Sequence, residues 1–213
     1  EIRLIFISDT HLGSNSKDHL KTIISKVKAL EFDLLLIGGD FIDSDAFDLD
    51  DLDFLKAVNR PILFISGNHE YYLKDYEHKL KRLKNYNVIF LNNEAYKYKN
   101  LQVIGICDNE TVSSQEMITN KLVKDGFFNL VLVHKPSLWD QVCKEIDLML
   151  SGHTHNGQIF PFNFFVRMRF RYIYGLYEKL NSKLYVSSGS GCWGPKMRLG
   201  TKNEIVNIVI ANR

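Results

Sequence analysis

Five patches along the chain carry side chains that can bind metal ions: Asp9-Thr10-His11, Gly39-Asp40 with Asp43, Gly67-Asn68-His69-Glu70, His134, and Gly152-His153-Thr154-His155. A single histidine after a strand is more often structural than functional, but five histidines in such patches reverse that balance. Mixed imidazole and carboxylate ligands suit borderline divalent metals such as manganese, iron or zinc. Two metals about 3.5–4 Å apart can clamp the attacking and leaving oxygens when a phosphate ester is cleaved. The patches therefore predict a dinuclear metal site for phosphate ester chemistry.

Each patch follows an apolar run that is typical of a buried strand: Ile2–Ile7, Phe32–Ile37, Pro61–Ser66, Leu130–Val133 and Ile146–Leu150. Continuous apolar strands indicate sheets that are covered on both faces. Ligands of such folds bind at the carboxyl ends of the strands. We therefore expect the five patches to meet at one edge of the fold. The other two histidines, His19 and His78, fall on expected helices and are predicted to be solvated.

The remaining elements alternate in type along the chain. Apolar spacing predicts helices over Leu20–Leu30, Phe47–Val58, Tyr71–Tyr86, Ser113–Lys124 and Ser137–Lys144. Further strands are predicted at Val88–Leu91, Tyr96–Tyr98, Leu101–Cys107, Lys183–Ser187 and Glu204–Ile210. The sequence contains no internal repeat, linker or low-complexity tract, so we expect residues 1–213 to form one domain.

Composition narrows the class of protein. The 213 residues are 45% hydrophobic and 24% charged, which is ordinary for a globular domain. A formal net charge of +2 argues against a nucleic-acid partner. Three separated cysteines (Cys107, Cys143 and Cys192) are expected to be free thiols in a reducing compartment. No apolar run is long enough to span a membrane. We expect a cytoplasmic location, with peripheral contact at the inner membrane and an anchor preceding Glu1 as open alternatives.

The combined pattern of DxH, GDxxD, GNHE, a lone histidine and GHTH resembles the calcineurin-like metallophosphoesterase superfamily. The resemblance implies an α/β fold, a four-layer α/β/β/α sandwich in which two mixed sheets are flanked by helices. It also implies two divalent metal ions, with manganese favoured over iron and zinc.

The same resemblance implies a role for each patch. One metal would be held by Asp9, His11 and His155, and the other by Asn68, His134 and His153. Asp40 would bridge them, and a metal-bridging hydroxide would attack the phosphorus. His69 would act as general acid or transition-state stabiliser, oriented by Asp43. Ser44 stands where the Ser/Thr protein phosphatases carry arginine, which argues against a phosphoprotein substrate. Glu70 stands where many relatives have aspartate, and we expect little effect from that difference.

A longer pattern narrows the branch: Gly152–Gln158, Tyr174-Gly175-Leu176-Tyr177, Tyr185–Gly191, Pro195 and Arg198. It is similar to that of bacterial membrane-associated phosphodiesterases, including the chlamydial type of UDP-2,3-diacylglucosamine pyrophosphatase. This resemblance implies a phosphodiester or pyrophosphate bond in a lipid- or nucleotide-linked substrate at a membrane surface. A soluble phosphodiesterase acting on cyclic nucleotides or small diesters and a non-catalytic scaffold remain alternatives.

Seven of the fifteen residues in Phe160–Tyr174 are aromatic, and Arg167, Arg169 and Arg171 alternate with apolar residues. Such a segment can insert rings at a lipid interface while its arginines meet phosphates. An ordinary strand with one packed and one wet face is the alternative. We expect Arg167 and Arg171 to contact substrate, and Arg198 either to bind a substrate phosphate or to be a surface residue. Trp193 is expected to pack, with a role in recognition as the alternative.

Overall fold

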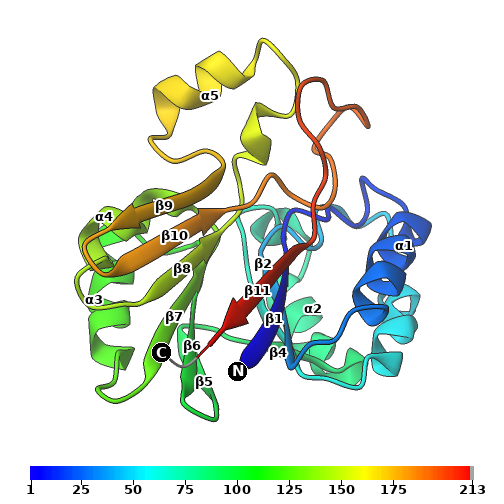
Figure 1. Ribbon diagram of the computed structural model, residues 1–213. Coiled ribbons are helices and arrows are strands. Elements are labelled where there is room, and N and C mark those ends of the chain that lie inside the picture. The colour runs from blue at the N-terminus through cyan, green and yellow to red at the C-terminus, as the bar shows by residue number, and fades with distance from the viewer. Residues whose placement is uncertain (212–213) are drawn as a thin grey trace.

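The computed structural model describes residues 1–211, which form two β-sheets between two groups of helices (Figure 1). The first sheet has five strands in the order β11-β1-β2-β3-β4. Their bounds are β1 (Ile2–Ile7), β2 (Leu34–Gly38), β3 (Ile62–Ile65), β4 (Val88–Phe90) and β11 (Val206–Ile210). Strands β1 to β4 are parallel neighbours, and β11 pairs antiparallel with β1.

The second sheet has six strands in the order β5-β6-β7-β8-β10-β9. Their bounds are β5 (Glu94–Tyr98), β6 (Leu101–Ile106), β7 (Phe128–Val133), β8 (Leu148–Ser151), β9 (Gly175–Lys179) and β10 (Ser182–Val186). The four central strands β6, β7, β8 and β10 are parallel, and the two edge strands are antiparallel to them. Both sheets are therefore mixed.

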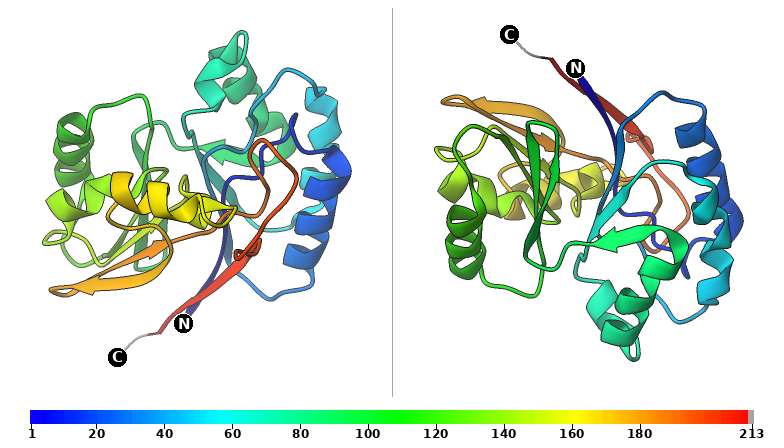
Figure 2. Two further views of the ribbon diagram at one scale, coloured as in Figure 1. Left: turned by 90° about the horizontal axis from the view of Figure 1, so that it is seen from above. Right: turned by 90° about the horizontal axis from the view of Figure 1, so that it is seen from below.

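Helices cover the outer face of each sheet (Figure 2). The first sheet packs against α1 (Lys17–Lys28), α2 (Tyr76–Arg82) and the 3₁₀ segments η1 (Leu49–Ala57) and η3 (Leu83–Tyr86). The second sheet packs against α3 (Val112–Leu122), η4 (Pro136–Leu138) and α4 (Trp139–Val142). A third apolar cluster lies between the sheets, with Leu4 and Leu36 from the first sheet and Val103 and Leu132 from the second. The predicted four-layer α/β/β/α arrangement is confirmed.

Local chemistry explains where several elements begin. Ser16 caps α1 by accepting a hydrogen bond from the backbone N–H of His19. A capping box between Asp48 and Asp51 starts the segment predicted as the helix Phe47–Val58, which is a 3₁₀ helix over Leu49–Ala57. The predicted helix Tyr71–Tyr86 is broken, since Asp75 has a left-handed φ of 51° between η2 (Glu70–Tyr72) and α2.

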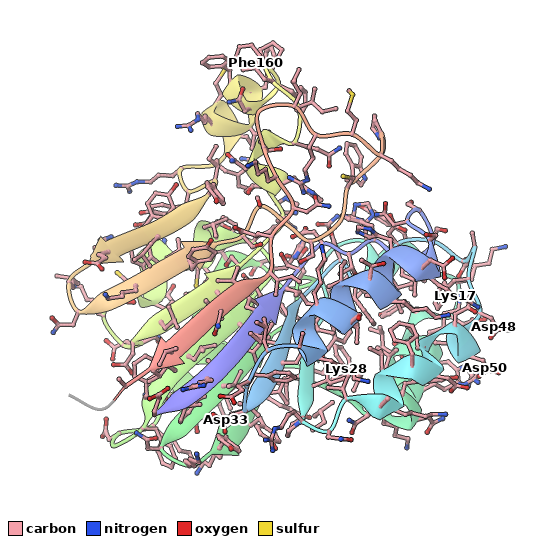
Figure 3. All side chains as sticks on the ribbon, turned by 45° about the vertical axis from the view of Figure 1, so that its right-hand side comes forward. Lys17, Lys28, Asp33, Asp48, Asp50 and Phe160 are labelled. Atoms are coloured by element: carbon pink, nitrogen blue, oxygen red, sulfur yellow. The ribbon has the colours of Figure 1, made fainter. Side chains whose placement is uncertain are left out.

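The aromatic segment Phe160–Tyr174 is not a strand. It contains α5 (Asn163–Arg169), a helix with no buried residue, which stands above the ends of the sheets beside the C-terminal loop (Figure 1). Figure 3 shows Phe160 at this far end of the molecule. The strand alternative is therefore wrong, while β9, which the sequence did not predict, follows directly. Within residues 1–211 we find no helix of sufficient length and apolarity to traverse a bilayer.

Candidate metal centre

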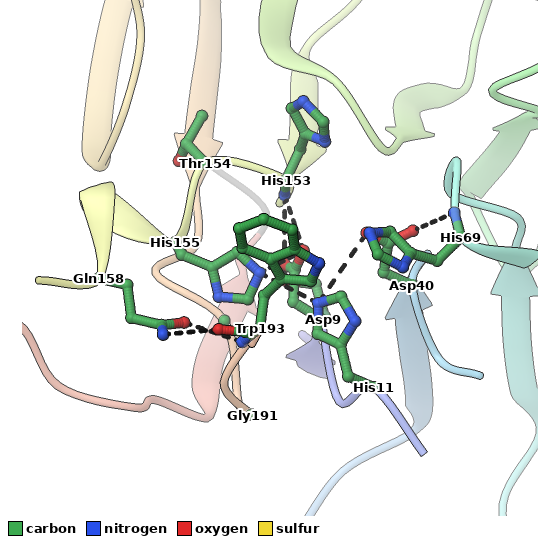
Figure 4. Close-up of polar contacts among 12 residues, drawn as sticks. Asp9, His11, Asp40, His69, His153, Thr154, His155, Gln158, Gly191 and Trp193 are labelled. Atoms are coloured by element: carbon green, nitrogen blue, oxygen red, sulfur yellow. Dashed lines mark hydrogen bonds and ion pairs between the residues drawn. The ribbon is translucent and has the colours of Figure 1, made fainter. Parts of the chain in front are cut away.

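The predicted ligands come from loops at the carboxyl ends of parallel strands, as the sequence pattern requires. Strand β1 leads into Asp9 and His11, β2 into Asp40, β3 into Asn68 and His69, β7 into His134, and β8 into His153 and His155. Ligand atoms of Asp9, His11 and His155 lie within 4.8 Å of one another, as do those of Asp40, His134 and His153. The structure thus brings residues of both sheets into one site (Figure 4).

The backbone of these loops adopts conformations that turn the side chains inward. Five of the ligand residues have left-handed φ angles between 48° and 72°: Asp9, His11, Asp40, His153 and His155. Such angles are uncommon for residues with a side chain, and they concentrate at functional sites. Two glycines allow the loops to approach, because a Cβ at Gly67 would overlap the Asp40 carboxylate and one at Gly152 would overlap that of Asp9.

The first triad is almost fully buried. Its two imidazoles face each other through their Nε2 atoms, 3.1 Å apart, and His155 Nε2 lies 3.5 Å from Asp9 Oδ1. His11 Nδ1 donates to Asp43 Oδ2 at 3.0 Å, which leaves the lone pair on Nε2. A carboxylate behind a histidine in this way fixes the tautomer that a metal needs.

This contact corrects the predicted role of Asp43. Its carboxylate lies within 4.8 Å of ligand atoms of both His11 and His69, but its hydrogen bonds go to His11 and to the Ser14 N–H. The expected support of His69 is replaced by support of His11, because the left-handed turn at His11 directs that ring onto the loop after β2. Asp43 therefore orients a candidate ligand rather than the candidate acid.

The second triad is organised by Asp40. His134 Nε2 lies 3.1 Å from Asp40 Oδ2 and 3.2 Å from His153 Nδ1. His134 Nδ1 donates to the Gly38 carbonyl at 2.8 Å, so Nε2 is the ring nitrogen that faces Asp40 and that a metal would bind once its proton is displaced. Asn68 Oδ1 is buried and has no hydrogen-bond partner within the described residues. An orphaned buried acceptor is costly, and a cation beside Asp40 would satisfy it.

Electrostatics favour cations in this site. Burial and the charge of His134 lower the pKa of His153 to about 3. Burial, His11 and Arg198 lower the pKa of His155 to about 4, so both rings are neutral at pH 7 and available as ligands. Although burial opposes it, Asp40 raises the pKa of His134 to about 10, and in turn His134 keeps the pKa of Asp40 well below its usual range. The Asp40 carboxylate therefore stabilises positive charge beside it.

The residues present fit two divalent metal ions. The donors are four histidine nitrogens and aspartate or asparagine oxygens around a central carboxylate, a mixture that suits borderline metals. The neutral rings of His153 and His155, the oriented rings of His11 and His134, and an Asn68 oxygen without a partner in residues 1–211 support this fit. Asp9, His11 and His155 form one donor group, and Asp40, His134 and His153 form a second. Asp40 faces both groups, since its Oδ2 lies 4.0 Å from His11 Nε2 and 3.1 Å from His134 Nε2.

Glu70 is a buried organiser of the site that the sequence did not identify. Its carboxylate is 0% exposed and accepts four backbone N–H groups, from Asp40, Phe41, Ile42 and Gly67, at 2.7–3.1 Å. It thereby ties the loop after β2 to the loop after β3. Burial and the Asp40 charge raise the pKa of Glu70 to about 7, against the four donors that favour its ionised form. The expected small effect of glutamate in place of aspartate stays a prediction, but the carboxylate at this position clearly organises the site.

The predicted catalytic residue His69 lies at the mouth of the site. Its side chain is 18% exposed, and its Nε2 lies 3.9 Å from Asp40 Oδ2. Burial lowers the pKa of His69, so the ring is neutral at pH 7. A neutral imidazole can still donate a hydrogen bond through its N–H.

The three predicted substrate-binding arginines lie in different surroundings. Arg198 donates to the carbonyls of Ser188, Gly191 and His155 at 2.6–3.1 Å. Its guanidinium therefore holds the loop between β10 and β11 against the loop that follows β8. Arg198 is part-buried, and its buried Nε has no hydrogen-bond partner within the described residues, so its substrate role stays a prediction. Arg171 is directed to Asp140, 3.4 Å away, and Arg167 is exposed on α5.

Two residues near the C-terminal loop also differ from expectation. Trp193 is 54% exposed rather than packed. His19 is not simply solvated, since its Nε2 lies 3.1 Å from the Ser190 carbonyl. Both environments depend on a loop that follows β10, and only the folded chain shows where that loop lies.

Comparison with known proteins agrees with this geometry. Residues 2–157 match the calcineurin-like phosphoesterase family. An uncharacterized metallophosphoesterase of Helicobacter pylori is 33% identical over 96% of the chain, and one of Aquifex aeolicus is 31% identical over 100% of it. A zebrafish (Danio rerio) transmembrane protein with a metallophosphoesterase domain is 31% identical over 98% of the chain.

The chain spans 58% of the Helicobacter relative, 53% of the zebrafish relative and 86% of the Aquifex relative. Among solved structures, an archaeal phosphodiesterase aligns over 89% of this chain and 85% of its own, with a TM-score of 0.52 and 14% identity. A putative 5'-nucleotidase from Staphylococcus aureus aligns over 99% of this chain and 55% of its own, with a TM-score of 0.57 and 13% identity. These two show the shared fold. The two-sheet fold, the strand-end histidines and aspartates and the matched residues together show that the chain belongs to the calcineurin-like phosphoesterase family.

Proposed function

We propose that this chain hydrolyses a phosphodiester or pyrophosphate bond in a lipid- or nucleotide-linked substrate at a membrane surface. The observation that carries the proposal is the convergence of two groups of metal-binding side chains on Asp40. The buried Asn68 Oδ1, which has no hydrogen-bond partner within the described residues, supports it. Two divalent ions, for which we propose manganese, would neutralise phosphate charge and activate water as the nucleophile. The intact ligand set counts against a non-catalytic scaffold.

The protein's own groups have separate parts in this proposal. Asp43 and the Gly38 carbonyl fix two of the imidazoles. His69 is at the open side of the centre, where its N–H can donate to the oxygen of the departing group. Residues 1–213 act as one domain in this proposal, which is supported by the apolar cluster shared by both sheets. The residues that hold the reacting centre are Asp9, His11, Asp40, Asn68, His134, His153 and His155.

Membrane contact is proposed through a surface that we call the cap, residues 159–171 and 193–202. A hydrogen bond from Phe160 N to Leu199 O joins its two segments, and Leu199 N donates in turn to Gln158 O. The cap exposes large apolar side chains, each at least half accessible: Phe160, Phe162, Phe164, Phe165, Met168, Trp193, Met197 and Leu199. An exposed apolar surface of this kind marks an interaction site.

The positive charge of the cap indicates that it binds an anionic surface. Its two segments contain no aspartate or glutamate and six basic residues: Arg167, Arg169, Arg171, Lys196, Arg198 and Lys202. Arg171 and Arg198 have protein partners, so the other four are available to an anionic surface. The zebrafish relative is named as a transmembrane protein, which also supports a site close to a bilayer. We propose the anionic cytoplasmic face of the inner membrane.

Hydrolysis is tested with Asp40→Asn and His134→Ala. Purified wild-type protein should bind two metals per chain and hydrolyse phosphodiesters or UDP-linked lipids with added manganese. Both variants should lose at least about a thousandfold in turnover while their circular dichroism spectra stay native. Exposed His78→Ala on α2 is the matched control and should retain activity. Equal activity in the wild type and the Asp40 variant would refute a metal-centred reaction.

Membrane contact is tested by co-sedimentation with phosphatidylglycerol and phosphatidylcholine vesicles. Burial of one phenylalanine contributes roughly 1.5–3 kcal/mol, so Phe164→Ser with Phe165→Ser should weaken binding by at least about a hundredfold. Met117→Ser, a change at a residue 72% exposed on α3, should leave it unchanged. Failure of the wild type to bind anionic vesicles, with fast turnover of soluble diesters, would favour a soluble phosphodiesterase instead.

A further inference from the structure

Two exposed aromatic rings flank His69 at the mouth of the metal centre. The ring centroid of Tyr72 lies 5.3 Å from that of His69, and the centroid of Trp193 lies 6.4 Å from it. Tyr72 is 70% exposed at the end of η2, and Trp193 is 54% exposed in the loop after β10. The two rings therefore approach the same histidine from separate parts of the chain.

Trp193 is held in place from the metal loop itself. The side chain of Gln158 accepts a hydrogen bond from the Trp193 N–H at 2.8 Å and donates to the Trp193 carbonyl at 2.8 Å. It also donates to the Pro195 carbonyl at 3.1 Å. Gln158 is only 8% exposed and follows His155 by three residues, so it fixes the Trp193 backbone relative to a metal ligand (Figure 4).

This arrangement fixes the backbone of Trp193 so that its indole lies beside His69, while more than half of the residue's surface stays in water. Single exposed apolar residues are ordinary, but this one has a buried amide dedicated to both polar groups of its backbone. Tryptophan and tyrosine present large rigid faces at little entropic cost, which suits them to recognise planar rings. Trp193 lies at the start of the second cap segment, where Gln158 holds its backbone and its ring faces His69.

We propose that Trp193 and Tyr72 form a binding surface for a nucleobase, so that the substrate of the proposed hydrolase is a nucleotide-linked phosphate ester. The metal centre would hold the phosphate while the base stacks on the rings beside His69. Gln158 is a positioning residue for Trp193. This inference rests on the proposed function, and it identifies which group attached to the phosphate is recognised.

The test compares uridine 5'-monophosphate with ribose 5-phosphate, which share the phosphate and sugar but differ in the base. Affinities are measured by calorimetry on the manganese-loaded protein. Base stacking on an aromatic side chain supports a preference for the nucleotide of about tenfold or more in the wild type. Trp193→Ala should abolish that preference while ribose 5-phosphate still binds, Trp193→Phe should retain part of it, and Gln158→Ala should reduce it. Met117→Ala on α3 is the control and should keep the full preference.

Fluorescence supplies a second readout, because the chain has two tryptophans and Trp139 is buried at 1% exposure. The nucleotide should quench wild-type emission and should not quench that of Trp193→Phe. Equal affinity for the two ligands in the wild type, failure of both to bind, or an unchanged preference in Trp193→Ala would overturn the inference. So would a Trp193→Ala variant that loses only vesicle binding. A preserved base preference without any hydrolysis would instead refute the proposed function alone.

Discussion

Replacing Glu70 by glutamine is the sharpest test of how the site is organised. In the native protein Oε1 accepts the N–H groups of Phe41 and Ile42, and Oε2 accepts those of Asp40 and Gly67. A glutamine amide keeps one oxygen and turns an NH₂ group toward two backbone donors. Those two buried N–H groups would lose their acceptor without gaining water.

The expected cost follows from that count. Each buried donor left unsatisfied costs about 1–3 kcal/mol, so two of them amount to about 2–6 kcal/mol. Burial and Asp40 raise the pKa of Glu70 to about 7, so part of the carboxylate's benefit is already offset by the cost of its charge. We therefore expect a loss in the lower half of that range, about 2–4 kcal/mol at pH 8. Domains of this kind are typically stable by about 5–15 kcal/mol, so the variant should still fold.

The measurement is urea unfolding at pH 8 with a chelator present, so that metal binding does not contribute. Glu70→Gln should lower the unfolding midpoint with an unchanged dependence on urea. It should also weaken metal binding, because Glu70 ties together the loops that carry Asp40 and Asn68. Glu77→Gln on α2, whose side chain is 68% exposed, is the control and should change stability by less than about 0.5 kcal/mol. A Glu70 variant that unfolds within about 0.5 kcal/mol of the wild type would show that the carboxylate does not hold the loops.

Three further outcomes test the electrostatics and packing. Asp43→Asn removes the carboxylate behind His11 and should weaken manganese binding about 10–100-fold by calorimetry; unchanged affinity would contradict its orienting role. In the metal-free protein, the raised pKa of His134 gives stability that is complete below pH 6.5 and lost as the pH rises toward 10, so the unfolding free energy should fall by up to about 5 kcal/mol. In His134→Asn, the unfolding free energy from urea titrations should depend only weakly on pH. A steep pH dependence in this variant would show that another group causes the loss of stability. Arg198→Met should lower the thermal midpoint, because three carbonyls lose their donor; an unchanged midpoint with a raised KM would indicate a substrate role.

The ligand positions could be predicted from the sequence because they obey a local rule. Each follows an apolar strand, and parallel strands end at a common edge, so residues far apart in the chain must meet there. The layered fold follows in the same way from the alternation of buried strands and amphipathic helices.

Predictions from the sequence failed where a residue's role depends on backbone conformation or on contacts with distant segments. The alternating arginines of Phe160–Tyr174 fit a strand as well as a surface segment, and the chain forms α5, in which no residue is buried. The sequence alone does not specify the roles of Arg198, Trp193 and Glu70, because their partners lie in other loops. Their roles depend on hydrogen bonds that the folded loops create, which no spacing rule contains.

By itself, the sequence determined which residue types stand at the strand ends, and therefore the metal chemistry. Only the tertiary structure decided which histidine Asp43 supports, how Glu70 joins two loops, and where Gln158 places Trp193. The physical reason is that left-handed turns at Asp9, His11 and Asp40 set the directions of the side chains. A turn of that kind is stable only when the surrounding loops constrain it, so it belongs to the assembled site rather than to any single segment.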